Sequence, residues 1–160
     1  MAHAIYEENM MYVGETPWHG IGRKLPREAT VEEMVAAAGF YAVATSSLYV
    51  PGSLKPAPGL RALVREDTGA VLAVVSPRYE VIQAREIAAT LVEAASGVKA
   101  IFTTAGLLGP NGSRFWMLAR LPEPIRVKGD RAEVHPFLLA TSTHDGSSPL
   151  VLMDTPVRVV

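Results

Sequence analysis

The stretch VKAIFTTAGLLGPNGSRFWMLARL, residues 98–121, decides the fold. Two runs rich in β-branched, aromatic and aliphatic residues, 98–108 and 114–121, flank the turn-forming tetrapeptide Gly109-Pro110-Asn111-Gly112. This pattern predicts an antiparallel hairpin. Strand side chains alternate between the two faces of a sheet. The core face of the second strand is therefore expected to hold Phe115, Met117, Ala119 and Leu121, and its opposite face Arg114, Trp116, Leu118 and Arg120.

Further strands are predicted on both sides of this hairpin. Residues 60–65 and 70–75 form a second hairpin around Glu66-Asp67-Thr68-Gly69, in which glycine supplies the positive φ. Residues 41–50 form an earlier strand, and the tract 51–59, with three prolines and two glycines, is expected to be a loop. Towards the end of the chain, strands are predicted at 125–127, 133–142 and 150–160, the first two around a Gly129-Asp130 turn.

Two helices complete the predicted fold. Thr30 is an N-cap with Glu33 at the capping-box position, and Gly39 ends this first helix. The second spans 83–95 and stops at Gly97, with Ile87, Leu91, Ala94 and Ala95 turned inward. Helices combined with consecutive hairpins predict an α+β fold, in which one curved antiparallel sheet carries both helices on one face.

The length of 160 residues fits a single domain. Its first part, residues 1–29, is expected to be a shaped loop whose Trp18 inserts into the domain, and residues 30–160 form the α+β core. The content of 49% hydrophobic and 19% charged residues excludes a disordered chain. No apolar run of about 18 residues and no secretory signal is visible, so we expect a cytoplasmic protein.

Few kinds of cofactor are compatible with this composition. The absence of cysteine excludes thiolate zinc sites, iron–sulfur clusters, disulfides and cysteine nucleophiles. The four histidines, His3, His19, His135 and His144, lack the spacing of metal ligands. We therefore expect neither a metal nor another cofactor.

One short segment, His144-Asp145-Gly146-Ser147-Ser148, combines the residue types of a hydrolytic triad. Triad members come from separated elements that converge on one point, which neighbours in a tight turn cannot easily do. Turn chemistry is the simpler interpretation, so we expect a non-enzymatic protein. A loop of small hydroxyls with unpaired backbone N–H groups could still hold a phosphate, which makes these five residues a candidate phosphate site.

A second candidate site is the face that carries Arg114, Trp116 and Arg120. Two guanidinium groups around an indole suit single-stranded nucleic acid, because bases stack on aromatic rings while arginine meets phosphate. Arg61 and Arg65 share a face of their own strand and could extend this surface. The alternative is a half-exposed tryptophan that stacks on an arginine by a cation–π contact. Because the net charge is −1, a basic face would have to come from the arrangement of the charged side chains and not from their number.

Four segments together carry a resemblance: YVGETPWHGIG at 12–22, VVSPRYEVIQ at 74–83, STHDGSS at 142–148 and TPVRVV at 155–160. They resemble the phage/plasmid-like protein family, which contains a domain of unknown function (DUF932). The resemblance implies a protein of bacteriophages and plasmids without assigned catalytic residues. Its relatives continue past the TPVRVV strand into a mostly helical region, so the chain is expected to correspond to the N-terminal part of such a protein.

These observations leave two functional hypotheses. The first is a non-enzymatic mobile-element protein that binds single-stranded DNA in replication or recombination. An outline similarity to ring-forming single-strand-annealing recombinases accompanies it, as an analogy of architecture alone. The second is a protein-interaction module that engages a host or defence protein, or associates with itself, because an apolar final strand can accept a partner strand. An enzyme would need His144, Asp145 or His19 to cluster in space.

Overall fold

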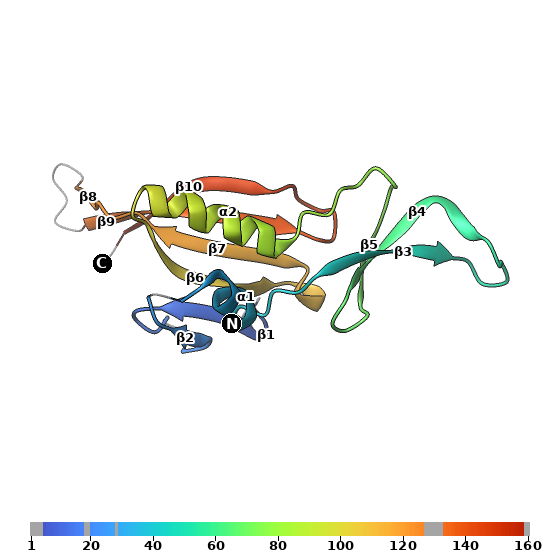
Figure 1. Cartoon of the computed structure of the whole chain (residues 1–160), viewed down its shortest axis with the longest axis horizontal. Helices are drawn as coiled ribbons and strands as arrows, with labels where there is room; N and C mark the ends of the chain where they lie inside the picture. Colours follow the sequence, from blue (N-terminus) through green and yellow to red (C-terminus); the bar gives the residue numbers. More distant parts are fainter. Residues whose placement is uncertain (1–4, 18–19, 28, 127–132, 159–160) are drawn as a thin grey trace.

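The computed structural model describes residues 5–17, 20–27, 29–126 and 133–158, with the side chains of Glu133, Val157 and Arg158 left undescribed. The predicted insertion of Trp18 and the predicted Gly129-Asp130 turn therefore lie outside the described residues. The remainder forms an α+β fold with two open sheets (Figure 1). In the described part of the chain, no helix is long and apolar enough to cross a membrane.

The larger sheet has seven strands in the order β10-β9-β7-β6-β1-β2, with β8 paired to β9. The predicted 98–121 hairpin lies at its centre as β6 and β7, joined by a short 3-10 helix, η1. All its neighbours pair antiparallel except β1 and β2, which are parallel. The bounds are β1 Ile5–Val13, β2 Arg23–Leu25, β6 Ile101–Leu108, η1 Pro110–Gly112, β7 Arg114–Arg120, β8 Ile125–Arg126, β9 Glu133–Thr143 and β10 Val151–Arg158.

A second sheet of three strands corrects the prediction of one continuous sheet. It consists of β3 (Val43–Tyr49), β4 (Pro56–Arg65) and β5 (Val71–Val75), and it projects from one end of the larger sheet (Figure 1). The predicted 51–59 loop is shorter than expected, because β4 already begins at Pro56. The strand tolerates proline there because β5 pairs only with positions 61–64 of β4, so this end of β4 has a partner on one side only.

The prediction that residues 1–29 form only a shaped loop is also wrong, since β1 and β2 lie within them. The β1–β6 register shifts between Ile5 and Met10, where Glu7 and Glu8 have φ values of 46° and 59°. This bulge removes the alternation by which a strand is recognised in a sequence. Gly106 of β6 accommodates it, because a Cβ there would lie 2.6 Å from the carbonyl oxygen of Asn9.

Both helices lie on one face of the larger sheet, as predicted (Figure 1). In α1 (Val31–Ala37), the Glu33 N–H donates to Thr30 Oγ1 at 3.2 Å, and the Thr30 N–H donates to the Glu33 carboxylate at 2.8 Å. This confirms the capping box. The buried stripe of α2 (Ala84–Gly97) comprises Ala84, Ile87, Ala88, Leu91 and Ala95. Ala94 was predicted to point inward but is exposed, because it lies at the margin of this stripe.

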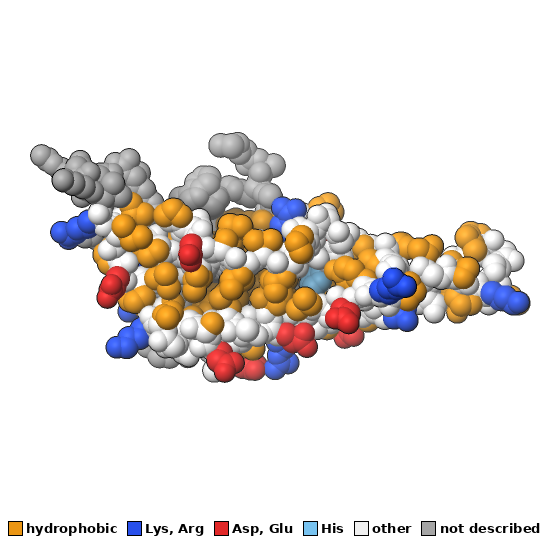
Figure 2. Space-filling model, turned by 90° about the horizontal axis from the view of Figure 1, so that it is seen from above, with side chains coloured by type: hydrophobic (Ala, Val, Ile, Leu, Met, Phe, Trp, Pro, Cys, Tyr) orange, Lys and Arg blue, Asp and Glu red, His pale blue; other side chains and the backbone are white. Residues whose placement is uncertain are grey.

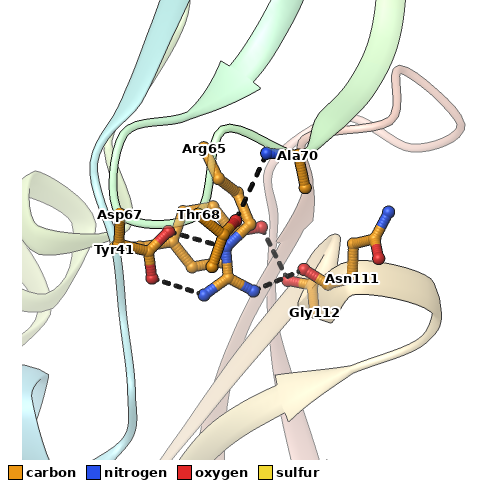
Figure 3. A network of polar contacts seen from close by, with 7 residues as sticks. All are labelled: Tyr41, Arg65, Asp67, Thr68, Ala70, Asn111 and Gly112. Carbon is orange, nitrogen blue, oxygen red and sulfur yellow. Dashed lines mark hydrogen bonds and ion pairs between the residues drawn. The ribbon is translucent and has the colours of Figure 1, made fainter.

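Arg65, at the end of β4, joins the two sheets (Figure 3). Its side chain is buried, and its Nε and Nη2 donate to the Asp67 carboxylate at 2.9 and 2.6 Å. Its Nη1 donates to the Asn111 carbonyl oxygen of η1 at 2.7 Å. The guanidinium carbon also lies 3.8 Å from the ring centre of Tyr41, whose hydroxyl donates to the Gly112 carbonyl oxygen at 2.8 Å. Gly112 has a φ of 65°, and a Cβ there would come within 3.3 Å of Arg65 Nη1.

We expect Arg65→Met to lower the free energy of unfolding by about 2 kcal/mol, because the Asn111 carbonyl oxygen would lose its donor and the exposed Asp67 carboxylate would lose its partner. Urea denaturation followed by circular dichroism measures the change. The matched control is Arg61→Met, which removes an exposed arginine from the same face of β4. It should change stability by no more than about 0.5 kcal/mol. Equal effects of the two substitutions would contradict the assigned role of Arg65.

Candidate functional site

The strand register places Arg114, Trp116 and Arg120 together on the face of the larger sheet opposite the helices. We call this surface the helix-free face. It is the face predicted from the alternation of β7, whose other residues Phe115, Met117 and Ala119 are buried beneath the helices. Cross-strand partners extend it over the neighbouring strands. Its described members include Lys24, Thr104, Gly106, Leu108, Arg114, Trp116, Leu118, Arg120, Phe137, Leu139, Thr141, Val151 and Met153.

Charge is divided between the two sides of the larger sheet. On the part of the helix-free face formed by the described positions of β2, β6, β7 and β10, the charged residues are Lys24, Arg114 and Arg120, all basic. Lys24 and Arg114 are exposed, and Arg120 is half-buried. The helix side carries exposed acidic side chains, at Glu32, Glu33, Glu86, Glu93 and Asp154. In these four strands the charged residues of the helix-free face are thus basic, although the net charge of the chain is −1.

Trp116 is half-buried on the helix-free face and lies outside the helix-covered core. Directly opposite it on β6 stands Gly106, against which the β1 bulge at Asn9 packs. The indole nitrogen is buried and has no hydrogen-bond acceptor among the described residues. The cation–π contacts of the described residues belong to Arg65, so the alternative of Trp116 stacked on a flanking arginine is not realised there.

Arg61 and Arg65 lie outside the larger sheet that carries the helix-free face. Both lie on β4 of the three-stranded sheet. Arg61 is exposed, but the Arg65 side chain is only 4% exposed and is bound to Asp67 and Asn111 in the joint between the two sheets. Binding of a phosphate by Arg65 would break its bonds to Asp67 and Asn111, so the predicted role of Arg65 is wrong, whereas that of Arg61 stays a prediction. The alternation of β4 indicated a shared face correctly but could not show that its end is buried.

His144 lies at the start of the β9–β10 loop and is 3% exposed. The centre of its ring is 6.0 Å from that of Tyr41 and 5.8 Å from that of Phe115. The backbone N–H of His144 donates to the Ser113 carbonyl oxygen at 2.7 Å. Its Nε2 is buried without a hydrogen-bond partner in the described part of the structure. Burial lowers the pKa of His144, which keeps the ring neutral near pH 7.

The neighbouring Asp145 stays ionised. Burial acts to raise its pKa, but hydrogen bonds from Ser147, Thr143 and Ser113 outweigh this and lower the pKa to about 2. The carboxylate accepts from the Ser147 N–H at 2.9 Å and from Ser113 Oγ at 3.2 Å. Among the described residues, no hydrogen bond joins the His144 ring to Asp145 or to a serine hydroxyl, so these groups do not have the connections of a catalytic triad.

A pocket of about 280 Å³ opens beside this loop and is lined by Tyr79, Glu80, Ser142, His144 and Ser148, among others. Two of the loop amides that a phosphate could use already have acceptors, since the Ser147 N–H donates to Asp145 and the Ser148 N–H donates to Thr143 Oγ1 at 2.9 Å. The carboxylates of Glu80 and Asp145 also disfavour an anion electrostatically. The geometry therefore suits a turn better than the predicted phosphate site. Within the described ranges, no cluster of three metal-ligating side chains occurs.

A family model described as Domain of unknown function (DUF932) matches residues 71–160. The chain belongs to this family. The match confirms the resemblance to DUF932 over residues 71–160. Comparisons with curated proteins and with solved structures found no match.

The DUF932 segment contains Arg114, Trp116, Arg120 and the His144 loop, whereas Arg65 and Lys24 precede it. Lys24 was not recognised from the sequence, because its place on the helix-free face depends on the parallel pairing of β2 with β1. A parallel pair has no hairpin turn by which it could be identified.

The stability of this DUF932 protein should fall as the pH drops below about 6.5. In that range the unfolded chain binds a proton at His144 at its ordinary pKa of 6.5, while burial keeps the folded residue neutral. The effect is absent above this range and grows as the pH falls towards the folded pKa. Urea midpoints at pH 7.5 and 5.5 measure it. His144→Phe should reduce the difference, and His135→Phe should leave it intact; an unaltered difference in His144→Phe would refute the assignment.

Proposed function

We propose that this DUF932 protein is a non-enzymatic mobile-element protein that binds single-stranded DNA on its helix-free face. The observation that carries the proposal is the basic and aromatic composition of this face beside an acidic helix side. Phosphates are attracted to the side with Lys24, Arg114 and Arg120 and repelled from the side with the glutamates. The bacteriophage and plasmid context comes from the resemblance of the four sequence segments.

The spacing of side chains along β7 suits a single strand of nucleic acid better than the groove of a double helix. Arg114 and Arg120 are six residues apart, which is about 20 Å at roughly 3.3 Å per residue. Trp116 lies between them on the same face, and on the neighbouring β9 Thr141 is opposite Trp116, Leu139 opposite Leu118 and Phe137 opposite Arg120. An open sheet with aromatic side chains between cations is a platform on which bases stack and phosphates are bound at the margins.

Removing one cation from the helix-free face should weaken binding of a fluorescein-labelled 30-nucleotide single strand several-fold. Fluorescence anisotropy of Arg114→Gln and Arg120→Gln at low salt measures this. Arg85→Gln is the matched control, because it removes one charge from an exposed position of α2 on the opposite side. With three phosphate contacts, the logarithm of the binding constant should fall with the logarithm of salt concentration at a slope of about −2. Equal affinities of all three variants would refute the proposal.

Replacing Trp116 by leucine should cost about 1–3 kcal/mol of binding free energy, because an aliphatic side chain cannot stack on a base. Leucine keeps the position apolar, and circular dichroism checks that the fold is retained. The matched control is Leu118→Ile, which conserves volume at the next position on the same face of β7. If Trp116→Leu binds the labelled strand as tightly as the wild type does, the indole has no part in recognition.

A further inference from the structure

The outer edge of β10 offers backbone hydrogen-bonding groups to a partner. β10 is the last strand in the sheet order, so no described strand lies beyond it. Pro156 is opposite Pro136, whose carbonyl oxygen accepts from the Leu121 N–H on its other side at 2.9 Å. The backbone hydrogen-bonding groups of Pro136 therefore face β7, and those of Pro156 face outward. Because this orientation repeats at every second residue, the backbone N–H and C=O groups of Leu152 and Asp154 face outward as well. Pro156 lacks an N–H, which limits the usable edge to a short segment before it.

An apolar groove runs beside this edge, between β10 and α2. It has a volume of about 220 Å³ and is lined mainly by Ile82, Ile87, Leu91, Ala94, Leu150 and Leu152. Three of these large side chains are strongly exposed, namely Ile82 at 45%, Leu150 at 41% and Leu152 at 63%. Figure 2 shows hydrophobic side chains gathered in a band along this side of the molecule, with acidic side chains beside it. Scattered single exposed leucines are ordinary, but a continuous band marks an interaction surface.

The charge around the groove is negative. Glu86 is the charged residue among the described lining side chains, and the exposed Asp154 projects from β10 on the helix side. The exposed Glu93 lies further along α2. A cationic side chain in the groove would be attracted by this surface, whereas nucleic acid would be repelled. Charge complementarity thus selects a basic peptide as the occupant.

We propose that β10 and the adjacent groove bind an extended segment of another protein, in which an apolar residue and a lysine or arginine lie two positions apart. The segment pairs with the outward groups of Leu152 and Asp154 as an additional strand. Because strand side chains alternate, every second side chain of the segment points to the helix side, where an apolar one fills the groove beside Leu152 and a basic one meets Glu86 or Asp154. Backbone pairing supplies affinity, and the groove supplies specificity.

Selection from a random decapeptide library displayed on phage tests this proposal with the whole chain as bait. We expect enrichment of peptides in which a lysine or arginine lies two positions from an apolar residue, so that both face the helix side. Synthetic peptides of the selected sequences should bind Leu152→Lys at least tenfold more weakly than the wild type in fluorescence anisotropy. The matched control is Leu54→Lys, a fully exposed leucine between β3 and β4, which should leave their affinity unchanged. Asp154→Lys should reduce the preference for basic peptides.

Three results would overturn the proposal. The first is a selection without peptides that have this spacing of a basic and an apolar residue, and the second is equal binding of selected peptides by the wild type and Leu152→Lys. The third is a concentration-dependent dimer of the wild type, seen by analytical ultracentrifugation and lost in Leu152→Lys, which would assign the edge to a second copy of this chain. Binding of single-stranded DNA takes place on the opposite face and should be unaltered in Leu152→Lys, so the two proposals fail independently.

Discussion

The buried guanidinium of Arg65 connects the two sheets, and the arrangement of the rest depends on it. It binds Asp67 in its own hairpin, the Asn111 carbonyl of η1 and the ring of Tyr41, and so bonds the three-stranded sheet to the turn between β6 and β7. A buried cation is stable only when its donors are satisfied, so each of these partners is constrained in position. Arg65, which the sequence suggested as a nucleic-acid-binding residue, is thus a structural residue that connects the two sheets.

A second set of contacts reinforces this joint from the helix side. The Gln83 side chain accepts from the Val43 N–H at 3.0 Å and donates to the Val43 carbonyl oxygen at 2.8 Å, as a neighbouring strand would. Because Gln83 also precedes α2, the start of the helix is tied to the start of β3. His144 packs against Tyr41 at the same place, which explains why a loop residue with a polar ring is buried. Tyr41 therefore contacts both the Arg65 joint and the His144 loop.

The larger sheet separates two surfaces of different chemistry. Its helix-covered face buries Phe115, Met117 and Ala140, and the residues in register with Trp116 are left on the other side. The helices bring glutamates to their own side, while β2 and β7 bring lysine and arginine to the other. A basic platform for nucleic acid and an acidic, apolar edge for a peptide can therefore coexist in a chain of nearly neutral charge.

Local chemistry by itself determined the capped helix at Thr30, the β6–β7 hairpin around Gly109–Gly112 and the alternation that separates Trp116 from Phe115, because each depends on residues close in the chain. Only the tertiary structure decided which arginines remain on the surface, the strand character of residues 5–13 and the division into two sheets. Arg65 and Asn111 are 46 residues apart, and β1 pairs with β6 across a bulge. Which residues are buried and which strands pair depends on contacts between residues that are far apart in the chain, and no local sequence pattern encodes those contacts.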